Sequence, residues 1–252
     1  MALLCLFVVG NTYALSKDNW YISAIPVVLG VITFGLLKPV QFWLFLVFLT
    51  PFSFVFYIPG VNASINLPTE PFTAFFVVLL VFKFLLEAKT DWRVLSHPIT
   101  ILIIAHLVWM LITCVMSSVP LVSFKYFISR LWYVIVFYFF GIQVFKSFKG
   151  IDKFHWAYVL SMGLAIVYSL VRHSQEHFSH DYSYAASRPF FSDHNIYAVI
   201  VAFFIPTAII YFLKSKTLKV SKLKTLLYMG LSLIYLVGVV ASYTRAAWVS
   251  LV

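Results

Sequence analysis

The chain has 252 residues, of which 63% are hydrophobic and 10% are charged, and its mean hydropathy is +0.98. A soluble domain carries charge on about a quarter of its residues, so this composition excludes a soluble protein. The net charge of +10 is compatible with nucleic-acid binding, but the Lys and Arg residues fall in short segments between apolar runs. That distribution is typical of membrane topology signals, and we predict no nucleic-acid partner.

Apolar runs rich in Leu, Phe and Val fill most of the chain. Several approach the roughly 20 residues that a helix needs to cross about 30 Å of hydrocarbon, and none alternates like a membrane β-barrel strand. We therefore predict an all-α, polytopic transmembrane bundle, a single integral membrane domain over 1–252 with about nine or ten spans in contact with lipid. The predicted spans are 1–15, 20–37, 39–58, 71–87, 98–116, 123–145, 151–171, 193–213 and 225–243, with a tenth beginning near 246.

The first predicted span resembles the apolar region of a signal peptide, but no basic residue precedes it, and a short membrane helix is favoured. The 18 Lys and Arg residues alternate between two sides from loop to loop. The positive-inside rule makes the more basic side cytoplasmic, together with the N-terminus and the basic loop 214–224. The cytoplasmic set is Lys38, Lys83, Lys89, Arg93, Lys146, Lys149, Lys153, Lys214, Lys216, Lys219, Lys222 and Lys224, and the outer set is Lys17, Lys125, Arg130, Arg172, Arg188 and Arg245.

The outer set is rich in Arg, whereas the cytoplasmic set is almost entirely Lys. Lys is a solvated point charge, but the planar guanidinium of Arg can grip phosphate or carboxylate with two hydrogen bonds. The alternative is that each outer Arg pairs with Asp181, Glu176 or a backbone carbonyl. Both interpretations stay open for Arg172, and anion binding is favoured for Arg188 and Arg245.

Two ionisable residues fall inside predicted spans. Arg130 lies about 10 Å into its helix from the outer end, where it either extends to the interface beside Lys125 and Tyr126 or faces a cavity and holds a phosphate; the first is favoured. His106 lies in the middle of its span, and we expect it to be hydrogen-bonded within the bundle.

The longest polar interval is the outer loop 172–192, which with the residues just after it holds four of the seven histidines, His173, His177, His180 and His194. His173 and His177 would share one face of a continued helix, where Glu176 or Asp181 could complete a zinc site. The letters "HSQEH" lack the H-E-x-x-H order, so solvated loop histidines are favoured and no metal is predicted. Cys5 and Cys114 fall inside predicted spans, which indicates neither a disulfide framework nor a Cys-based metal site.

Two junctions between polar and apolar sequence are alike, "SRPFFSDHNIYAVIVAFFIP" and "SYTRAAWVSLV". In the first, Pro189 disfavours helix at Arg188, and Ser192 or Asp193 can cap the helix that follows. The N–H groups at that helix start would add to Arg188 as an anion site. In the second, Thr244 is the candidate cap and Arg245 lies in the first turn. Two such junctions suit a diphosphate at the outer membrane surface.

The two junctions also resemble the O-antigen ligase and polymerase family, in which an Arg-bearing outer loop leads into an "N-hydrophobic-aromatic/small" helix start and an "S-x-S/T-R-G/A-A/G-W" helix start follows. The resemblance covers roughly residues 183–252, and the remainder agrees in hydropathy and topology alone. The matching residues are Arg188, Asn195 and Tyr197, then Ser242, Thr244, Arg245, Ala246, Ala247 and Trp248.

The resemblance implies an enzyme of the bacterial cytoplasmic membrane that needs no cofactor. Such an enzyme transfers a glycan from an undecaprenyl-diphosphate carrier to a sugar acceptor, either lipid A core or a growing polysaccharide, at the outer face. Its arginines would hold the diphosphate, and its base would be a His in a large outer loop further along. That loop would lie beyond residue 252, so the chain is expected to be an N-terminal fragment. His194 lies inside the matching motif and is assigned to binding or helix capping before catalysis.

Two other functions stay open. A carrier of lipid-linked sugar or polysaccharide needs charged groups along a path through the bilayer, and only Arg130 and His106 lie within predicted spans. A non-catalytic membrane scaffold is compatible with the 27 Phe and 15 Tyr residues, and it predicts that the outer arginines tolerate replacement by Ala.

Overall fold

The computed structural model describes residues 11–12, 16–17, 21–57, 64–87, 92–217 and 221–251. It confirms the all-α polytopic class, since six helices in the described ranges are long and apolar enough to cross a membrane. The predicted span 1–15 lies outside the described residues except for two positions. The six are Thr69–Leu86 in α4, Pro98–Val115 (α5), Pro120–Phe145 (α6 to α7), Phe148–Gln175 (α8), His194–Ser215 in α10 and Lys222–Ala241 (α11).

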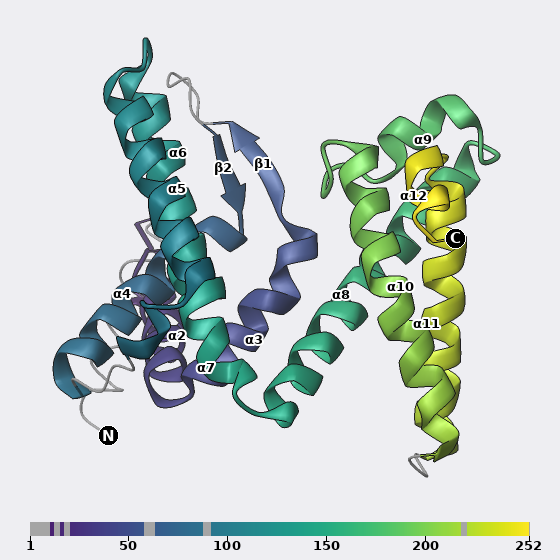
Figure 1. Cartoon of the computed structure of the whole chain (residues 1–252), viewed down its shortest axis with the longest axis horizontal. Coiled ribbons are helices and arrows are strands. Elements are labelled where there is room, and N and C mark those ends of the chain that lie inside the picture. Colours follow the sequence, from purple (N-terminus) through teal and green to yellow (C-terminus); the bar gives the residue numbers. More distant parts are fainter. Residues whose placement is uncertain are drawn as a thin grey trace.

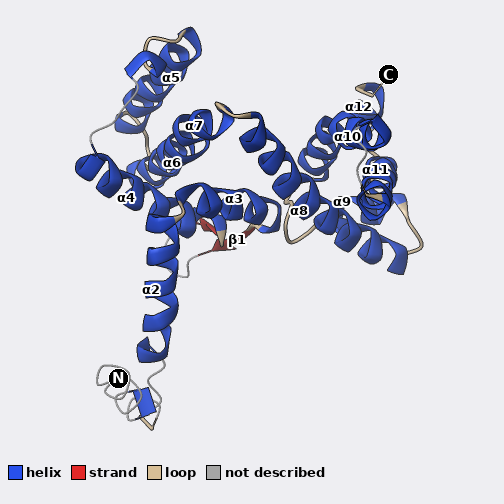
Figure 2. Cartoon of the chain, turned by 90° about the horizontal axis from the view of Figure 1, so that it is seen from below, coloured by secondary structure: helices blue, strands red, loops and turns tan. Residues whose placement is uncertain are grey.

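The predicted spans 20–37 and 39–58 form one sharply bent pair instead of two complete crossings. Helix α2 (Tyr21–Leu37) and the segment made of α3 (Pro39–Leu49) and a 3₁₀ turn (Thr50–Phe52) meet at an angle of 117°. Lys38, between them, has the non-helical angles φ −134° and ψ 60°, because a residue before proline is disfavoured in the helical region. Figure 2 shows α2 extending away from the other helices.

Four residues near the end of the run 39–58 form a strand. β1 (Phe54–Tyr57) pairs antiparallel with β2 (Ser64–Leu67). An aromatic and β-branched stretch that follows a proline favours this conformation. Hydropathy alone does not separate such a strand from the end of a helix.

A buried carboxylate ties the hairpin to two helices. Glu70, at the start of α4 (Thr69–Glu87), is 3% exposed. Its side chain accepts hydrogen bonds from Asn66 N at 2.9 Å and from the Ser129 hydroxyl, and it pairs with Lys125 Nζ at 3.0 Å. The Lys125 ammonium also donates to the Ser64 carbonyl. Strand β2, α4 and α6 (Pro120–Tyr133) are thus joined through one anion.

Helix α6 continues through a π-helical segment (Val134–Phe140, labelled η3) into α7 (Gly141–Phe145). The Trp43 indole N–H of α3 donates to the Val136 carbonyl in this segment at 2.9 Å. Trp43 and Val136 are both 1% exposed or less. The contact fixes α3 against the middle of the α6–α7 span.

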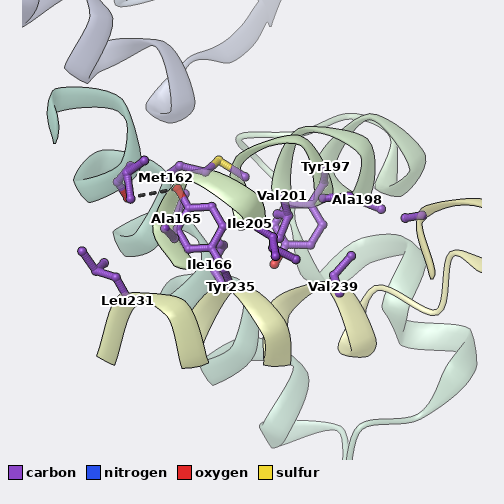
Figure 3. Close-up of a cluster of buried hydrophobic side chains, with 14 residues drawn as sticks. Met162, Ala165, Ile166, Tyr197, Ala198, Val201, Ile205, Leu231, Tyr235 and Val239 are labelled. Carbon is purple, nitrogen blue, oxygen red and sulfur yellow. Dashed lines mark hydrogen bonds between the residues drawn. The ribbon is translucent and has the colours of Figure 1, made fainter. Parts of the chain in front are cut away.

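Two hydrophobic clusters are joined by α8 (Phe148–Gln175). The first cluster is formed by α3, α4 and the α6–α7 span around Phe42, Trp43 and Phe76, and Phe154 and Tyr158 of α8 pack against it. The second lies between α8, α10 (His194–Thr217) and α11 (Lys222–Ala241) (Figure 3). Its members are Val159, Met162, Ala165, Ile166, Tyr197, Ala198, Val201, Ala202, Ile205, Ala208, Leu231, Tyr235, Val239 and Ala247.

From α5 onward, the connections alternate between two ends of the molecule. In Figure 1 the turn between α5 and α6, α9 (His180–Ala186) and α12 (Arg245–Val249) lie at the upper end. The turn between α7 and α8, the end of α10 and the start of α11 lie at the lower end. We call the upper part of the C-terminal bundle, which carries Arg172, Arg188 and Arg245, the arginine end.

Gly238 of α11 packs against side chains of both α8 and α10. A Cβ at this position would lie 2.6 Å from Ile166 Cγ2 and 3.2 Å from the Tyr197 hydroxyl. Gly238→Ala should lower the free energy of unfolding by about 1–3 kcal/mol, because the β-branched, fully buried Ile166 cannot move aside. Thermal unfolding in detergent measures the effect.

Gly230→Ala is the matched control on the same helix, because no heavy atom lies within 4 Å of its added carbon. This variant should leave the midpoint unchanged or raise it, since Ala favours helix over Gly. Equal midpoints for the two variants would contradict close packing at Gly238.

Candidate functional site

The arginine end is built where α8 ends and the chain turns back. Helix α8 ends at Gln175, and His177 and Phe178 then adopt positive φ angles of 53° and 54°. The Phe178 N–H donates to the His173 carbonyl at 3.1 Å. This reversal places α9 against the last turns of α8.

His173 is a buried helix residue, so the interpretation of solvated loop histidines is wrong for this one. It is 1% exposed, and its ring contacts those of Phe178, Tyr182 and Tyr243 at 5.2–6.3 Å between centroids. Its Nε2 lies 2.9 Å from the Ser179 carbonyl oxygen. Helix α8 runs four residues past the predicted end at 171, and this extension carries His173 beneath the aromatic rings. The described residues contain no group of three or more His, Cys, Asp or Glu able to hold a metal.

Arg172 is engaged by backbone carbonyls. Its Nη1 donates to the carbonyl of Arg188 and, at 3.4 Å, to that of Ala185. Its Nη2 donates to the Tyr182 hydroxyl at 2.9 Å, and the guanidinium carbon lies 5.8 Å from the ring centroids of Tyr168 and Tyr182. Of the two interpretations left open, these contacts favour pairing with the backbone, and they make Arg172 the residue that fixes the segment leading to Arg188.

The two junction segments meet through a row of aromatic contacts. Tyr243, from the second junction, donates its hydroxyl to the Phe178 carbonyl at 3.0 Å and contacts the His180 ring at 5.3 Å. His180 contacts Tyr184 at 5.6 Å, and Tyr184 contacts His194, from the first junction, at 4.4 Å. Positions about fifty residues apart in the sequence thus share one surface.

Arg188 and Arg245 are both exposed at this end. Arg188 follows α9 and precedes Pro189, and Arg245 is the first residue of α12. Among the residues that the structure describes, neither guanidinium has a hydrogen-bond or ion-pair partner. Both side chains are therefore open to bind an anion from solvent.

Asp193 caps α10. It is one of the two residues, Ser192 or Asp193, that the sequence offered as the cap. Its Oδ1 accepts from the Asn195 N–H at 2.8 Å, whereas Ser192 is exposed. The carboxylate occupies a donor at the helix start and adds a negative charge there, which weakens the expected contribution of this helix end to anion binding. His194 Nδ1 lies 3.4 Å from the same Asp193 oxygen, and Asn195 is exposed.

Thr244 occupies the cap position of α12, but its side chain makes no cap hydrogen bond. Its hydroxyl donates to the Ser242 carbonyl at 3.2 Å, and both residues are buried. The Trp248 indole N–H donates to the Val239 carbonyl at 2.9 Å. The second junction is thus held onto α11 by Trp248, and Thr244 contributes to the turn instead of the cap.

Arg130 is not brought together with the other three arginines. It is exposed on α6, and Figures 1 and 2 both show α6 on the opposite side of the molecule from α9 and α12. Of the four arginines that sequence reasoning selected, three therefore lie at the arginine end: Arg172, Arg188 and Arg245.

Sequence reasoning missed the tyrosines that build this surface, Tyr182, Tyr184 and Tyr243. A signal was present, since "HDYSYAAS" places two aromatic residues inside an otherwise polar segment. Tyr182 and Tyr184 are two positions apart, so they point to different sides of the helix. Tyr182 contacts Arg172 and His173, whereas Tyr184 contacts His180 and His194.

Comparisons with protein-family models, with curated proteins and with solved structures found no match for this chain.

Arg172→Ala removes the donors that hold the Ala185 and Arg188 carbonyls and the Tyr182 hydroxyl. We expect the amides of Arg188 and Phe191, which bond within this segment, to exchange at least about tenfold faster, because charged hydrogen bonds contribute about 1.5–3 kcal/mol. Hydrogen exchange followed by mass spectrometry measures this. Arg130→Ala, which removes an exposed Arg elsewhere, should leave the exchange unchanged, and equal rates in the two variants would contradict the assignment.

Proposed function

We propose that this multi-pass membrane protein takes part in transferring a glycan from an undecaprenyl-diphosphate carrier to a sugar acceptor, as an O-antigen ligase or polymerase. The reaction would occur at the periplasmic face of the bacterial inner membrane. One observation carries the proposal. The two segments that resemble this family come together at the arginine end, where Ala247 of α12 is buried in the same cluster as Tyr197 and Ala198 of α10. A row of ring contacts also runs from Tyr243 through His180 and Tyr184 to His194.

The diphosphate would bind to Arg188 and Arg245. Each guanidinium is exposed and offers a planar set of donors that matches two phosphate oxygens. When the glycosidic bond to the carrier breaks, negative charge develops on the leaving diphosphate, and the two guanidinium cations would stabilise it without a cofactor. Arg172 would act as a positioning residue, because it holds the carbonyl of Arg188 itself.

The acceptor hydroxyl also needs a base to take its proton. His194 is the histidine within the two junction segments, between the Tyr184 ring and the Asp193 carboxylate. These neighbours fix one side of the His194 ring, and we assign this ring to contact with the carrier-linked glycan. The family resemblance assigns the base to a different histidine.

The test is selective binding of the carrier diphosphate. Arg188→Lys and Arg245→Lys keep the positive charge but lose the two-pronged geometry, so each should weaken binding of undecaprenyl diphosphate by about tenfold, or about 1.4 kcal/mol. Native mass spectrometry of the protein in detergent, with undecaprenol as the uncharged competitor, measures the preference.

Arg130→Lys is the control, because Arg130 lies on the other side of the molecule, and it should bind as the unchanged protein does. Undiminished diphosphate binding by both Arg188→Lys and Arg245→Lys would refute the proposal. Equal affinity of the unchanged protein for undecaprenol and for undecaprenyl diphosphate would do so as well.

A further inference from the structure

The turn between α11 and α12 holds a tyrosine in a backbone conformation that favours glycine. Tyr243 has a φ angle of 51°, which is unfavourable for residues with a β-carbon because that carbon crowds the backbone. A glycine would form the same turn without this strain. The sequence instead has a large aromatic side chain here, whose contacts offset the strain. The side chain therefore has a role that the turn itself does not need.

The Tyr243 side chain reaches the segment that leads to Arg188. Its hydroxyl donates to the Phe178 carbonyl at 3.0 Å, and its ring centroid lies 6.0 Å from that of His173 and 5.3 Å from that of His180. Phe178 belongs to the reversal that directs the chain from α8 into α9. One side chain of the second junction thus contacts the end of α8, the reversal and the start of α9.

From His173 the contacts continue to the backbone of Arg188. The ring centroids of His173 and Tyr182 lie 6.3 Å apart, and the Tyr182 hydroxyl accepts from Arg172 Nη2 at 2.9 Å. The other terminal nitrogen of Arg172 donates to the Arg188 carbonyl. The tyrosine at the opposite end of this series lies two residues before Arg245. Direct contacts therefore join the segment of one exposed arginine to the backbone of the other.

The other side-chain hydrogen bonds of the second junction hold it onto α11 or stay within it. Thr244 donates to the Ser242 carbonyl at the end of α11, and Trp248 donates to that of Val239. Among the residues that the structure describes, the Tyr243 hydroxyl is the donor of this junction that bonds to the chain before α10. Tyr243 thus links the second junction to the segment that carries Arg188.

We propose that Tyr243 is a positioning residue that aligns Arg245 with Arg188, so that the two guanidinium groups bind one diphosphate together. The proposal rests on the diphosphate role proposed above for these arginines. It goes beyond the family resemblance, whose second motif leaves the position of Tyr243 open. A diphosphate offers one phosphate group to each arginine, and the second contact strengthens the first only when the spacing is fixed. A monophosphate engages a single arginine and does not depend on that spacing.

The ratio of the affinities for undecaprenyl diphosphate and undecaprenyl monophosphate tests the proposal. Tyr243→Phe removes the hydroxyl that bonds to Phe178, and we expect the diphosphate preference to fall at least about threefold, as for the loss of one hydrogen bond. Tyr243→Gly keeps the turn but removes the whole side chain, so the preference should fall further. The affinity for the monophosphate should stay unchanged in both variants. Native mass spectrometry of the protein in detergent measures the affinities.

Tyr235→Phe is the matched control. It removes the same kind of bond, from a tyrosine hydroxyl to the Val159 carbonyl at 3.0 Å, but inside the hydrophobic cluster of α8, α10 and α11. This variant should lower the midpoint of thermal unfolding in detergent, because a buried acceptor loses its partner. It should leave the diphosphate preference unchanged.

The double variant Arg188→Lys, Tyr243→Phe tests whether Tyr243 acts through the pair of arginines. In the Arg188→Lys chain the two-arginine contact is already lost, so adding Tyr243→Phe should weaken diphosphate binding by a smaller factor than it does in the unchanged chain. Equal factors in the two chains would show that Tyr243 acts independently of Arg188, and would overturn the proposal.

Three further outcomes would overturn it. The diphosphate preference could be unchanged in both Tyr243 variants, or the affinities for diphosphate and monophosphate could fall equally, or Tyr235→Phe could lower the preference as much as Tyr243→Phe does. In each of these cases the unchanged protein would still prefer undecaprenyl diphosphate to undecaprenol, so the proposed function would stand. Equal binding of those two lipids by the unchanged protein would refute the proposed function, and the role of Tyr243 with it.

Discussion

The packing of one helix into two hydrophobic clusters determines where the other elements lie. Near its start, α8 places Phe154 and Tyr158 against the cluster of α3, α4 and the α6–α7 span. One turn later it places Met162 and Ile166 in the cluster with α10 and α11. Its last turn carries Arg172 and His173 to the arginine end. The orientation of the candidate site therefore depends on the same helix that joins the two halves.

Polar side chains within the bundle are satisfied largely by backbone carbonyls. Tyr235 donates to the Val159 carbonyl at 3.0 Å (Figure 3) and Trp43 to that of Val136 at 2.9 Å. Arg172 follows the same rule at the arginine end. A carbonyl satisfies the donor without cancelling the charge, so the positive charge of Arg172 still adds to the potential around Arg188. Glu70 is the contrasting case, because it is paired with the cation of Lys125.

Hydropathy predicted the spans 71–87, 98–116, 151–171 and 225–243 to within a few residues at most ends, because each is an apolar run between polar breaks. It failed at 39–58, where a strand and a helix are equally apolar and only Pro39 and Pro51 indicate the interruptions. Local rules also predicted the Asp193 cap correctly, since capping involves neighbouring residues.

The candidate site was less predictable, because its contacts join distant positions. The burial of His173 needs Tyr243, seventy residues further along, and the anchoring of Arg172 needs carbonyls in a segment without regular sequence pattern. No periodicity encodes such pairs. The exposure of His106 on α5 is a similar case, since its position in the span follows from hydropathy but the direction of its face follows from how α5 packs on α6.

The π-helical segment between α6 and α7 determines which residues of that span face the core. A turn bonded from residue i to i+5 holds one more residue than an α-helical turn, so the segment behaves as a tolerated insertion. If the segment closed into regular α-helix with the same number of residues, everything beyond it would rotate by about 100°. Phe140 and Val144, which are now buried with Trp43, would then turn toward lipid. The parts of the span before and after the π-helical segment thus both face the core, because the segment accommodates the extra residue.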